Sequence, residues 1–228
     1  MSDCQAGPGE PLGDHLLGVA DCVSKRGVAV AKKLARVFKI GEDEALDLIT
    51  FAALAHDAGK ADVSYEKAID RFPLHEVKST AFVKRVFQEL RIIDNCDLGR
   101  GEDSLAKAVV AAVALHHYVH KEPNKATVAD GLTPRCLDVA EAFKQWRPRT
   151  PLGEALKSKA LEIAAGNVGP NTCYRDVVNT LHSVSTRLRY AVMAILGVLN
   201  RCDYEVAKAR RAAEHPGTPA DILARPRV

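Results

Sequence analysis

Residues 42–61 read EDEALDLITFAALAHDAGKA, and this stretch predicts the centre of the fold. Consecutive acidic residues at its start favour the positive end of a helix dipole. The apolar residues that follow recur at helical spacing and therefore predict a core helix: Leu46, Ile49, Ala53 and Leu54. Gly59 is expected to end this helix, which places His56 and Asp57 in its last turn.

Helical periodicity continues along most of the chain, whereas β-branched alternation is rare. The expected fold is therefore all-α. A helix is expected from Pro11 to Phe38, with Asp14 as a possible cap and a weakening at Gly27. Two more are expected to begin after Pro73 and at Ser104. Residues 174–213 are expected to form two helices or one helix kinked near Gly197. Residues 120–152 are expected to form a loop with at most a short helix over 137–146.

Length and composition predict one domain. The chain has 228 residues, of which 47% are hydrophobic, and this is enough for one compact core over 1–228. Residues 1–10 and 214–228 are rich in glycine or proline and are expected to be extended tails.

The first residues lack the pattern of a signal peptide, and the longest apolar run, 190–199, is short for a membrane span of about 20 residues. We therefore expect a cytoplasmic protein without membrane contact. The six cysteines are scattered singly, without a C-x-x-C pair. They are expected to be reduced structural thiols.

Charge alone does not indicate a nucleic-acid binder, because the net charge is only +3. Its distribution is more informative, since residues 24–40 contain six basic residues and no acidic one. This stretch is equally consistent with a solvated helix face and with a surface that contacts phosphates.

Histidine and aspartate recur where the predicted apolar helices begin or end. Each one has an ordinary explanation by itself, such as a cap, a surface position or an ion pair. Together they offer five imidazoles and two carboxylates, a nitrogen-rich ligand set sufficient for two metal ions. These residues are His15, His56, Asp57, His75, His116, His117 and Asp203.

The order H, HDxGK, H, HH, D resembles the HD superfamily of metal-dependent phosphohydrolases. More narrowly, the segments LAHDAGK, HEVKS, ALHHYVH and LNRCD resemble the HD nuclease of type I CRISPR interference, the Cas-three nuclease, in its stand-alone form. The resemblance extends from about His15 to Arg211. It implies an HD-domain helical bundle around a metal centre.

The same resemblance implies roles for individual residues. One divalent ion would be held by His15, His56, Asp57 and Asp203, and a second by His75, His116 and His117, with Asp57 bridging. The ions would be Mn, Mg, Ni, Co or Fe. Asp57 and Lys60 would be catalytic, with Lys60 contacting a substrate phosphate or polarising the attacking water, although a lysine after a helix end can also be merely solvated.

Some positions depart from the pattern or stay open. The hydroxyl residue often found four positions after the last aspartate is replaced by Ala207. His120 could be an additional ligand, whereas His182 and His215 match nothing in the pattern and are expected to be ordinary residues.

Three functions are compatible with these residues. The first is cleavage of single-stranded DNA, with a separate helicase and an RNA-guided CRISPR surveillance complex as partners, because the chain has no G-x-x-x-x-G-K-[ST] motif of its own. The second is an HD nucleotidase or cyclic-nucleotide phosphodiesterase. The third, a non-catalytic binding module, is disfavoured because every expected ligand is present.

Few residues are available to contact DNA bases. Aromatic residues make up only 5% of the chain, so stacking of bases would depend on Tyr118, Trp146 or Tyr204. The basic residues Arg147 and Arg149 offer a further DNA contact.

Overall fold

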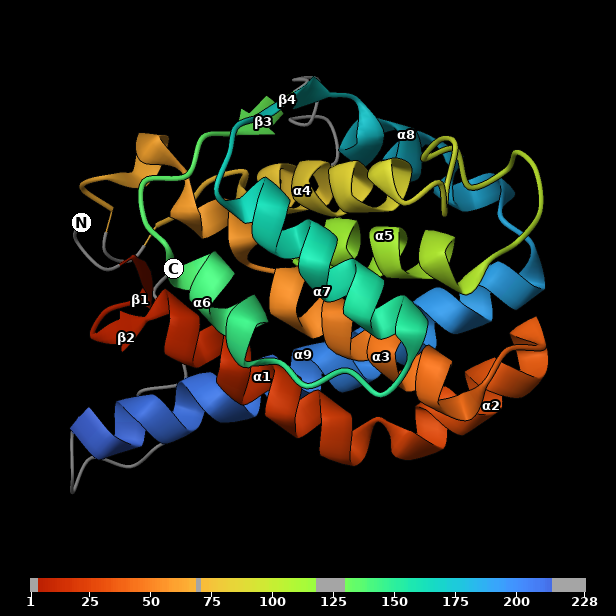
Figure 1. Ribbon diagram of the computed structural model, residues 1–228, viewed down its shortest axis with the longest axis horizontal. Coiled ribbons are helices and arrows are strands. Elements are labelled where there is room, and N and C mark those ends of the chain that lie inside the picture. The colour runs from red at the N-terminus through yellow and green to blue at the C-terminus, as the bar shows by residue number, and fades with distance from the viewer. Residues whose placement is uncertain (1–3, 69–70, 118–129, 215–228) are drawn as a thin grey trace.

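The computed structural model describes residues 4–68, 71–117 and 130–214. Its helices are α1 (Leu12–Arg26), α2 (Val28–Phe38), α3 (Glu42–Ala55), α4 (His75–Glu89), α5 (Leu105–Leu115), α6 (Asp138–Gln145), α7 (Pro151–Ala164), α8 (Cys173–Thr180) and α9 (Thr186–Glu214) (Figure 1). Short 3-10 helices are η1 (Ala58–Ala61), η2 (Val63–Tyr65) and η5 (Leu181–Ser183). Two small antiparallel pairs join β1 (Gln5–Gly7) to β2 (Glu10–Pro11) and β3 (Asp130–Leu132) to β4 (Val168–Asn171). The all-α prediction is confirmed.

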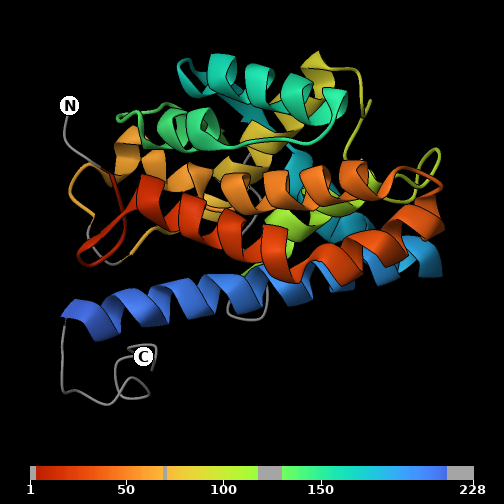
Figure 2. The ribbon, with the colours of Figure 1, turned by 60° about the horizontal axis from the view of Figure 1, so that its bottom comes forward.

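Helices α3 and α5 form the centre of the core. All residues of α3 from Ala45 to Ala55 and all residues of α5 are buried, including the polar side chains of Asp47, Thr50 and Lys107. Phe51 of α3 stacks on Phe87 of α4, with ring centroids 5.3 Å apart. Figure 2 shows α9 running beneath α1 and α2, with α6 and α7 on the opposite side of α3. Helix α3 therefore lies in a middle layer, between α1, α2 and α9 on one side and α6 and α7 on the other.

Several predicted boundaries are confirmed. The expected weakening at Gly27 is a complete break between α1 and α2, and a Cβ there would lie 2.5 Å from the carbonyl oxygen of Val23. At the start of α5 the hydroxyl of Ser104 accepts a hydrogen bond from the backbone N–H of Lys107. Helix α6 lies within the expected short helix, although residues 118–129 of the expected loop lie outside the described residues.

Other boundaries differ from the prediction. Of the two alternatives for 174–213, two helices are confirmed as α8 and α9, whereas the expected kink near Gly197 is wrong, because α9 runs through Gly197 without interruption. Asp14 does not cap α1, because Pro11 occupies the cap position, and its carboxylate instead accepts a hydrogen bond from Arg210. The expected tail over 1–10 is wrong for the described part, since β1 and β2 form a pair next to the buried Cys4. Residues 215–228, including His215, lie outside the described residues.

The expectation of reduced thiols is wrong. All six cysteines form disulfides, Cys4–Cys136, Cys22–Cys202 and Cys96–Cys173. Their sequence separations of 132, 180 and 77 residues leave no local pattern by which the pairs could be recognised.

These disulfides bear on the predicted localisation. Disulfides are typical of oxidising compartments and of some hyperthermophiles, so cytoplasmic localisation stays a prediction. In the described part of the chain, no helix has both the length and the apolar character needed to cross a membrane.

Candidate metal centre

The seven predicted ligand residues meet in the fold, six of them at or next to helix ends and Asp203 within α9. His15 lies in the first turn of α1, His75 begins α4, and Asp203 lies on α9. His56 and Asp57 follow α3 directly, as His116 and His117 follow α5. Their ligand atoms form two compact groups, Asp57 with His75, His116 and His117, and His15 with His56 and Asp203, and within each group these atoms lie within 4.8 Å of one another.

The path of the chain after α3 explains how Asp57 enters this space. Helix α3 ends at Ala55, and Asp57 (φ −109°, ψ 11°) precedes η1. Gly59 is therefore part of η1 and does not end α3 as expected. A Cβ on Gly59 would lie only 2.1 Å from the carbonyl oxygen of His75, so glycine allows η1 to pack directly against the first turn of α4. This close contact brings His75 beside Asp57.

The imidazoles are oriented through their Nδ1 atoms. Three of them donate to a backbone carbonyl three residues earlier, at 2.7, 2.6 and 2.7 Å: His56 to Ala53, His75 to Phe72 and His116 to Val113. Since a carbonyl can only accept, each Nδ1 carries the proton and each Nε2 keeps its lone pair. This arrangement is typical of metal-binding histidines.

The Nε2 atoms fit a metal. Those of His15, His56, His75 and His116 are buried, and neither they nor Oδ1 of Asp57 has a hydrogen-bond partner among residues 4–68, 71–117 and 130–214. A buried polar atom without a partner costs about 1–3 kcal/mol. Divalent cations coordinated by these lone pairs would remove that cost, so the donor set is suited to them.

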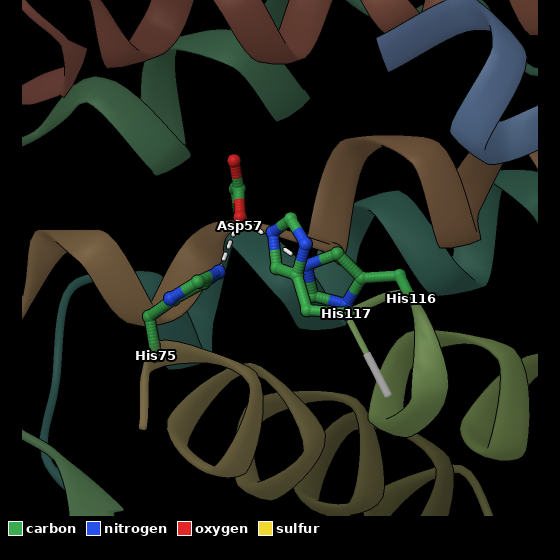
Figure 3. Close-up of side chains that lie close together, drawn as sticks. All are labelled: Asp57, His75, His116 and His117. Atoms are coloured by element: carbon green, nitrogen blue, oxygen red, sulfur yellow. Dashed lines mark ion pairs between the residues drawn. The ribbon is translucent and has the colours of Figure 1, made fainter. Parts of the chain in front are cut away.

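The two oxygens of Asp57 face different groups. Oδ1 lies 3.0 Å from Nε2 of His75 and 3.4 Å from Nε2 of His116. Oδ2 lies 3.5 Å and 3.4 Å from the corresponding atoms of His15 and His56. Figure 3 shows one oxygen directed at the imidazoles of α4 and α5 while the other points away from them. Asp57 is thus placed between the two groups.

Asp203 completes the group around His15. Its Oδ1 lies 3.2 Å from Nε2 of His15 and 3.9 Å from Nε2 of His56. Its side chain is 23% exposed, whereas those of His15 and His56 are 3% and 0% exposed. The centre is therefore more accessible to solvent at Asp203 than at these imidazoles.

Lys60 lies inside the centre and does not extend into solvent. Its Nζ donates to Oδ2 of Asp57 at 2.7 Å and to the carbonyl oxygen of Ala6 at 2.9 Å. It also lies 5.3 Å from the ring centroid of Phe72. The ammonium group therefore balances the charge of Asp57, and its contact with a substrate phosphate stays a prediction.

Charges in the centre keep the ligands in metal-binding forms. Burial alone would raise the pKa of Asp57, but the ammonium group of Lys60 holds it well below its usual range. Burial lowers the pKa of His75 and, with His116 and His75 nearby, lowers that of His117 to about 2.

His15 is the exception. Burial alone would lower its pKa, but the carboxylates of Asp203, Asp57 and Glu10 raise the pKa of this imidazole well above its usual value. For Asp203, burial would raise the pKa, but His15 and His56 hold it well below the usual range. Metal binding at His15 therefore competes with a proton.

Glu10 was missed by the sequence-based prediction. It is buried on β2, and its Oε1 lies 2.8 Å from Nδ1 of His15. A glutamate five residues before a histidine, in a stretch expected to be a tail, gives no signal of this contact.

Among the residues expected to contact DNA, Trp146 is buried, whereas Arg147, Arg149 and Tyr204 are exposed. Trp146 is buried against Phe51 and Phe143, and the guanidinium of Arg147 donates to backbone carbonyls next to it. Arg149 pairs with Asp43. Tyr204 and His182 are exposed, whereas Tyr118 and His120 lie outside the described residues.

Comparison with known protein families gives a match. Residues 13–147, more than half of the chain, match the family model described as HD domain. The matched range contains six of the seven candidate metal ligands, and Asp203 joins them through the fold. A search of curated proteins finds no match.

Proposed function

Because this chain belongs to the HD-domain family of metal-dependent phosphohydrolases, we propose that it is a two-metal phosphodiesterase that cleaves single-stranded DNA. The observation that carries this proposal is Asp57, whose two oxygens face two separate groups of imidazoles with free Nε2 atoms. A carboxylate shared in this way is suited to bridging a pair of ions.

Each residue of the metal centre has a proposed role. One ion would be held by His15, His56 and Asp203 and the other by His75, His116 and His117, and Asp57, which lies between the two groups, would contribute to both. When bound, two divalent ions supply a nucleophile at neutral pH and stabilise the charge on the entering and leaving oxygens. Lys60 holds Asp57 through Oδ2, and one of its three donors can be transferred from Ala6 to a phosphate oxygen.

A polymeric substrate is supported by the position of α2. The basic side chains of 24–40 are exposed: Lys25, Arg26, Lys32, Lys33, Arg36 and Lys39. Helix α3 separates the end of α2 from Asp57, and its 14 residues span about 20 Å. A mononucleotide cannot reach both places, whereas a nucleic-acid strand can.

We propose further that cleavage serves CRISPR interference. The order of HD, H, HH and D segments supports this assignment through its resemblance to the stand-alone HD nucleases. The helicase would then be a separate polypeptide, and an RNA-guided complex would select the sequence, so the chain needs little sequence preference of its own.

The test is a substrate panel. Chelator-stripped protein is reloaded with Mn, Mg, Ni, Co or Fe and assayed on single-stranded DNA, a duplex with an unpaired bubble, intact duplex, RNA, a dinucleotide, nucleoside monophosphates and cyclic nucleotides. We expect cleavage of single strands, of the bubble and, more slowly, of the dinucleotide, and no turnover of intact duplex, RNA, nucleoside monophosphates or cyclic nucleotides. Turnover restricted to mononucleotides would instead establish a nucleotidase.

Two variants test the centre. Asp57→Ala is expected to abolish hydrolysis while the protein stays folded by circular dichroism. The matched control is Asp62→Ala, which also removes a buried aspartate but one bonded to Ser64 and Thr133 outside the centre. Full activity of purified Asp57→Ala would refute the proposed centre.

A third variant tests the basic helix. Lys32→Ser/Lys33→Ser/Arg36→Ser should weaken cleavage of long single strands and reduce the salt slope by about 2, since each lost phosphate contact removes about 0.7. Dinucleotide cleavage should be unchanged. An unchanged salt slope on long strands would show that α2 does not contact the substrate.

A further inference from the structure

His15 is oriented differently from the other imidazoles. His56 and His116 follow the last turns of α3 and α5, where carbonyls have no partner within the helix and can accept from Nδ1. His15 lies in the first turn of α1, where the carbonyls accept hydrogen bonds from the next turn. Its acceptor is therefore the side chain of Glu10, which lies outside the helix.

Glu10 belongs to a short anchored segment, residues 4–11, which we call the N-terminal strap. Cys4 at its start is disulfide-bonded to Cys136, and its backbone N–H donates to Asp138. The carbonyl of Cys4 accepts from the N–H of Leu12, so both ends of the strap are fixed at the start of α1. Between them, β1 and β2 pair, and Ala6 accepts a hydrogen bond from Lys60.

The strap thus contacts the metal centre at two points. The carboxylate of Glu10 accepts a hydrogen bond from Nδ1 of His15, while Nε2 of the same ring is directed at Asp57 and Asp203. Lys60, bonded to Ala6, is the second point of contact. A carboxylate acceptor on Nδ1 fixes the ring and makes Nε2 a stronger donor to a metal.

We propose that Glu10 is a positioning residue that sets metal affinity at the His15, His56 and Asp203 group, and that the Cys4–Cys136 disulfide keeps it in place. The inference rests on the proposed metal centre and concerns metal binding, independently of the substrate. It predicts that loss of Glu10 weakens the His15 group first, because Glu10 is bonded to His15 and not to the imidazoles around His75.

The test is calorimetric titration of chelator-stripped protein with Mn²⁺, which needs no substrate. Glu10→Ala should weaken one of two binding steps by about 10- to 100-fold, the usual effect of losing such a partner. Glu10→Gln, which keeps an oxygen acceptor, should restore part of the loss. The weakened step should be the one lost in His15→Ala and should differ from the one lost in His75→Ala.

Outcomes separate this inference from the proposed function. Wild-type protein that binds fewer than two Mn²⁺ ions would refute the two-metal centre itself. Two wild-type steps that are both unchanged in Glu10→Ala, or both weakened equally by Glu10→Ala and Glu10→Gln, would refute the positioning role.

The disulfide is tested with a matched pair of variants. Cys4→Ser/Cys136→Ser should weaken the same Mn²⁺ step as Glu10→Ala. The control variant Cys96→Ser/Cys173→Ser also removes one disulfide, which joins the segment after α4 to α8 and does not involve the strap. It should leave both Mn²⁺ binding steps within about 2-fold of wild type. Equal effects of the two pairs would show that the first disulfide acts only through general stability.

Discussion

Replacing Gly59 by alanine tests the contact that positions His75. A Cβ at Gly59 would lie 2.1 Å from the carbonyl oxygen of His75 and 2.9 Å from Cβ of Lys78. Neither neighbour is the mobile end of a side chain. Because real Cβ contacts are essentially never shorter than 3.0 Å, η1 and the first turn of α4 must separate by roughly 1 Å.

The cost follows from two effects. Overpacking of this kind costs about 1–3 kcal/mol. The same separation removes the buried hydrogen bond that the N–H of Gly59 donates to Ser79 at 2.8 Å, and an unpaired buried group costs another ~1–3 kcal/mol. We therefore expect Gly59→Ala to lower the free energy of unfolding by about 2–6 kcal/mol.

Gly197 supplies the matched control. It lies in the interior of α9, and a Cβ there meets nothing within 4 Å. Gly197→Ala should therefore raise stability by about 0.5–1 kcal/mol, since alanine loses less backbone entropy in a helix.

The measurement is urea unfolding of the metal-free protein, with thermal unfolding as a second probe. A loss of about 2–6 kcal/mol corresponds to a fall in Tm of about 4–24 °C for a domain of this size. If Gly59→Ala stayed within about 0.5 kcal/mol of wild type while Gly197→Ala behaved as expected, the tight packing of η1 on α4 would be refuted.

Other predictions concern the metal-free protein by the same unfolding measurement. The pKa of His117 is lowered to about 2 in the folded protein, whereas a histidine in the unfolded chain takes up a proton below about pH 6.5. The contribution of His117 to the free energy of unfolding is therefore fully present above that pH, and about 2 kcal/mol of it is lost by pH 5. His117→Gln should flatten the pH dependence between 7 and 5 by that amount, and an unchanged slope would contradict it. Asp47 is buried and accepts hydrogen bonds from the N–H groups of Arg149 and Thr150. Asp47→Ala should therefore lower the free energy of unfolding by about 3 kcal/mol, and a decrease below about 1 kcal/mol would show that water replaces these bonds. Ser104→Ala should cost about 1 kcal/mol through loss of the α5 cap, which an unchanged urea midpoint would contradict.

The fold class and most helices could be predicted because periodicity is a local property. Stretches such as 105–115 are apolar on every side, and only a buried helix accommodates such a sequence. The end of α3 could not be predicted in the same way. Gly59 has the form of a helix-ending glycine, but its role depends on contact with His75, which no local pattern contains.

The ligands of the candidate site could be predicted from the sequence, whereas a residue that supports them could not. His56, Asp57 and the pair His116–His117 stand out because they follow apolar helices. Glu10 does not, because its stretch is short, rich in glycine and proline, and anchored through a cysteine 132 residues away. Residues that support a site through tertiary contacts are thus harder to recognise than its ligands.

The positions of His56 and His116 have a common physical cause. The last carbonyls of α3 and α5 lack partners within their helices, and both helix ends lie in the core, where water cannot supply them. The Nδ1–H groups of the two histidines satisfy Ala53 and Val113, which removes a cost of burial and at the same time leaves Nε2 directed at Asp57. The requirement of the core and the requirement of a metal centre are therefore met by the same hydrogen bonds. An apolar helix that ends in histidine is for this reason a stronger indication of such a centre than the His-Asp dipeptide alone.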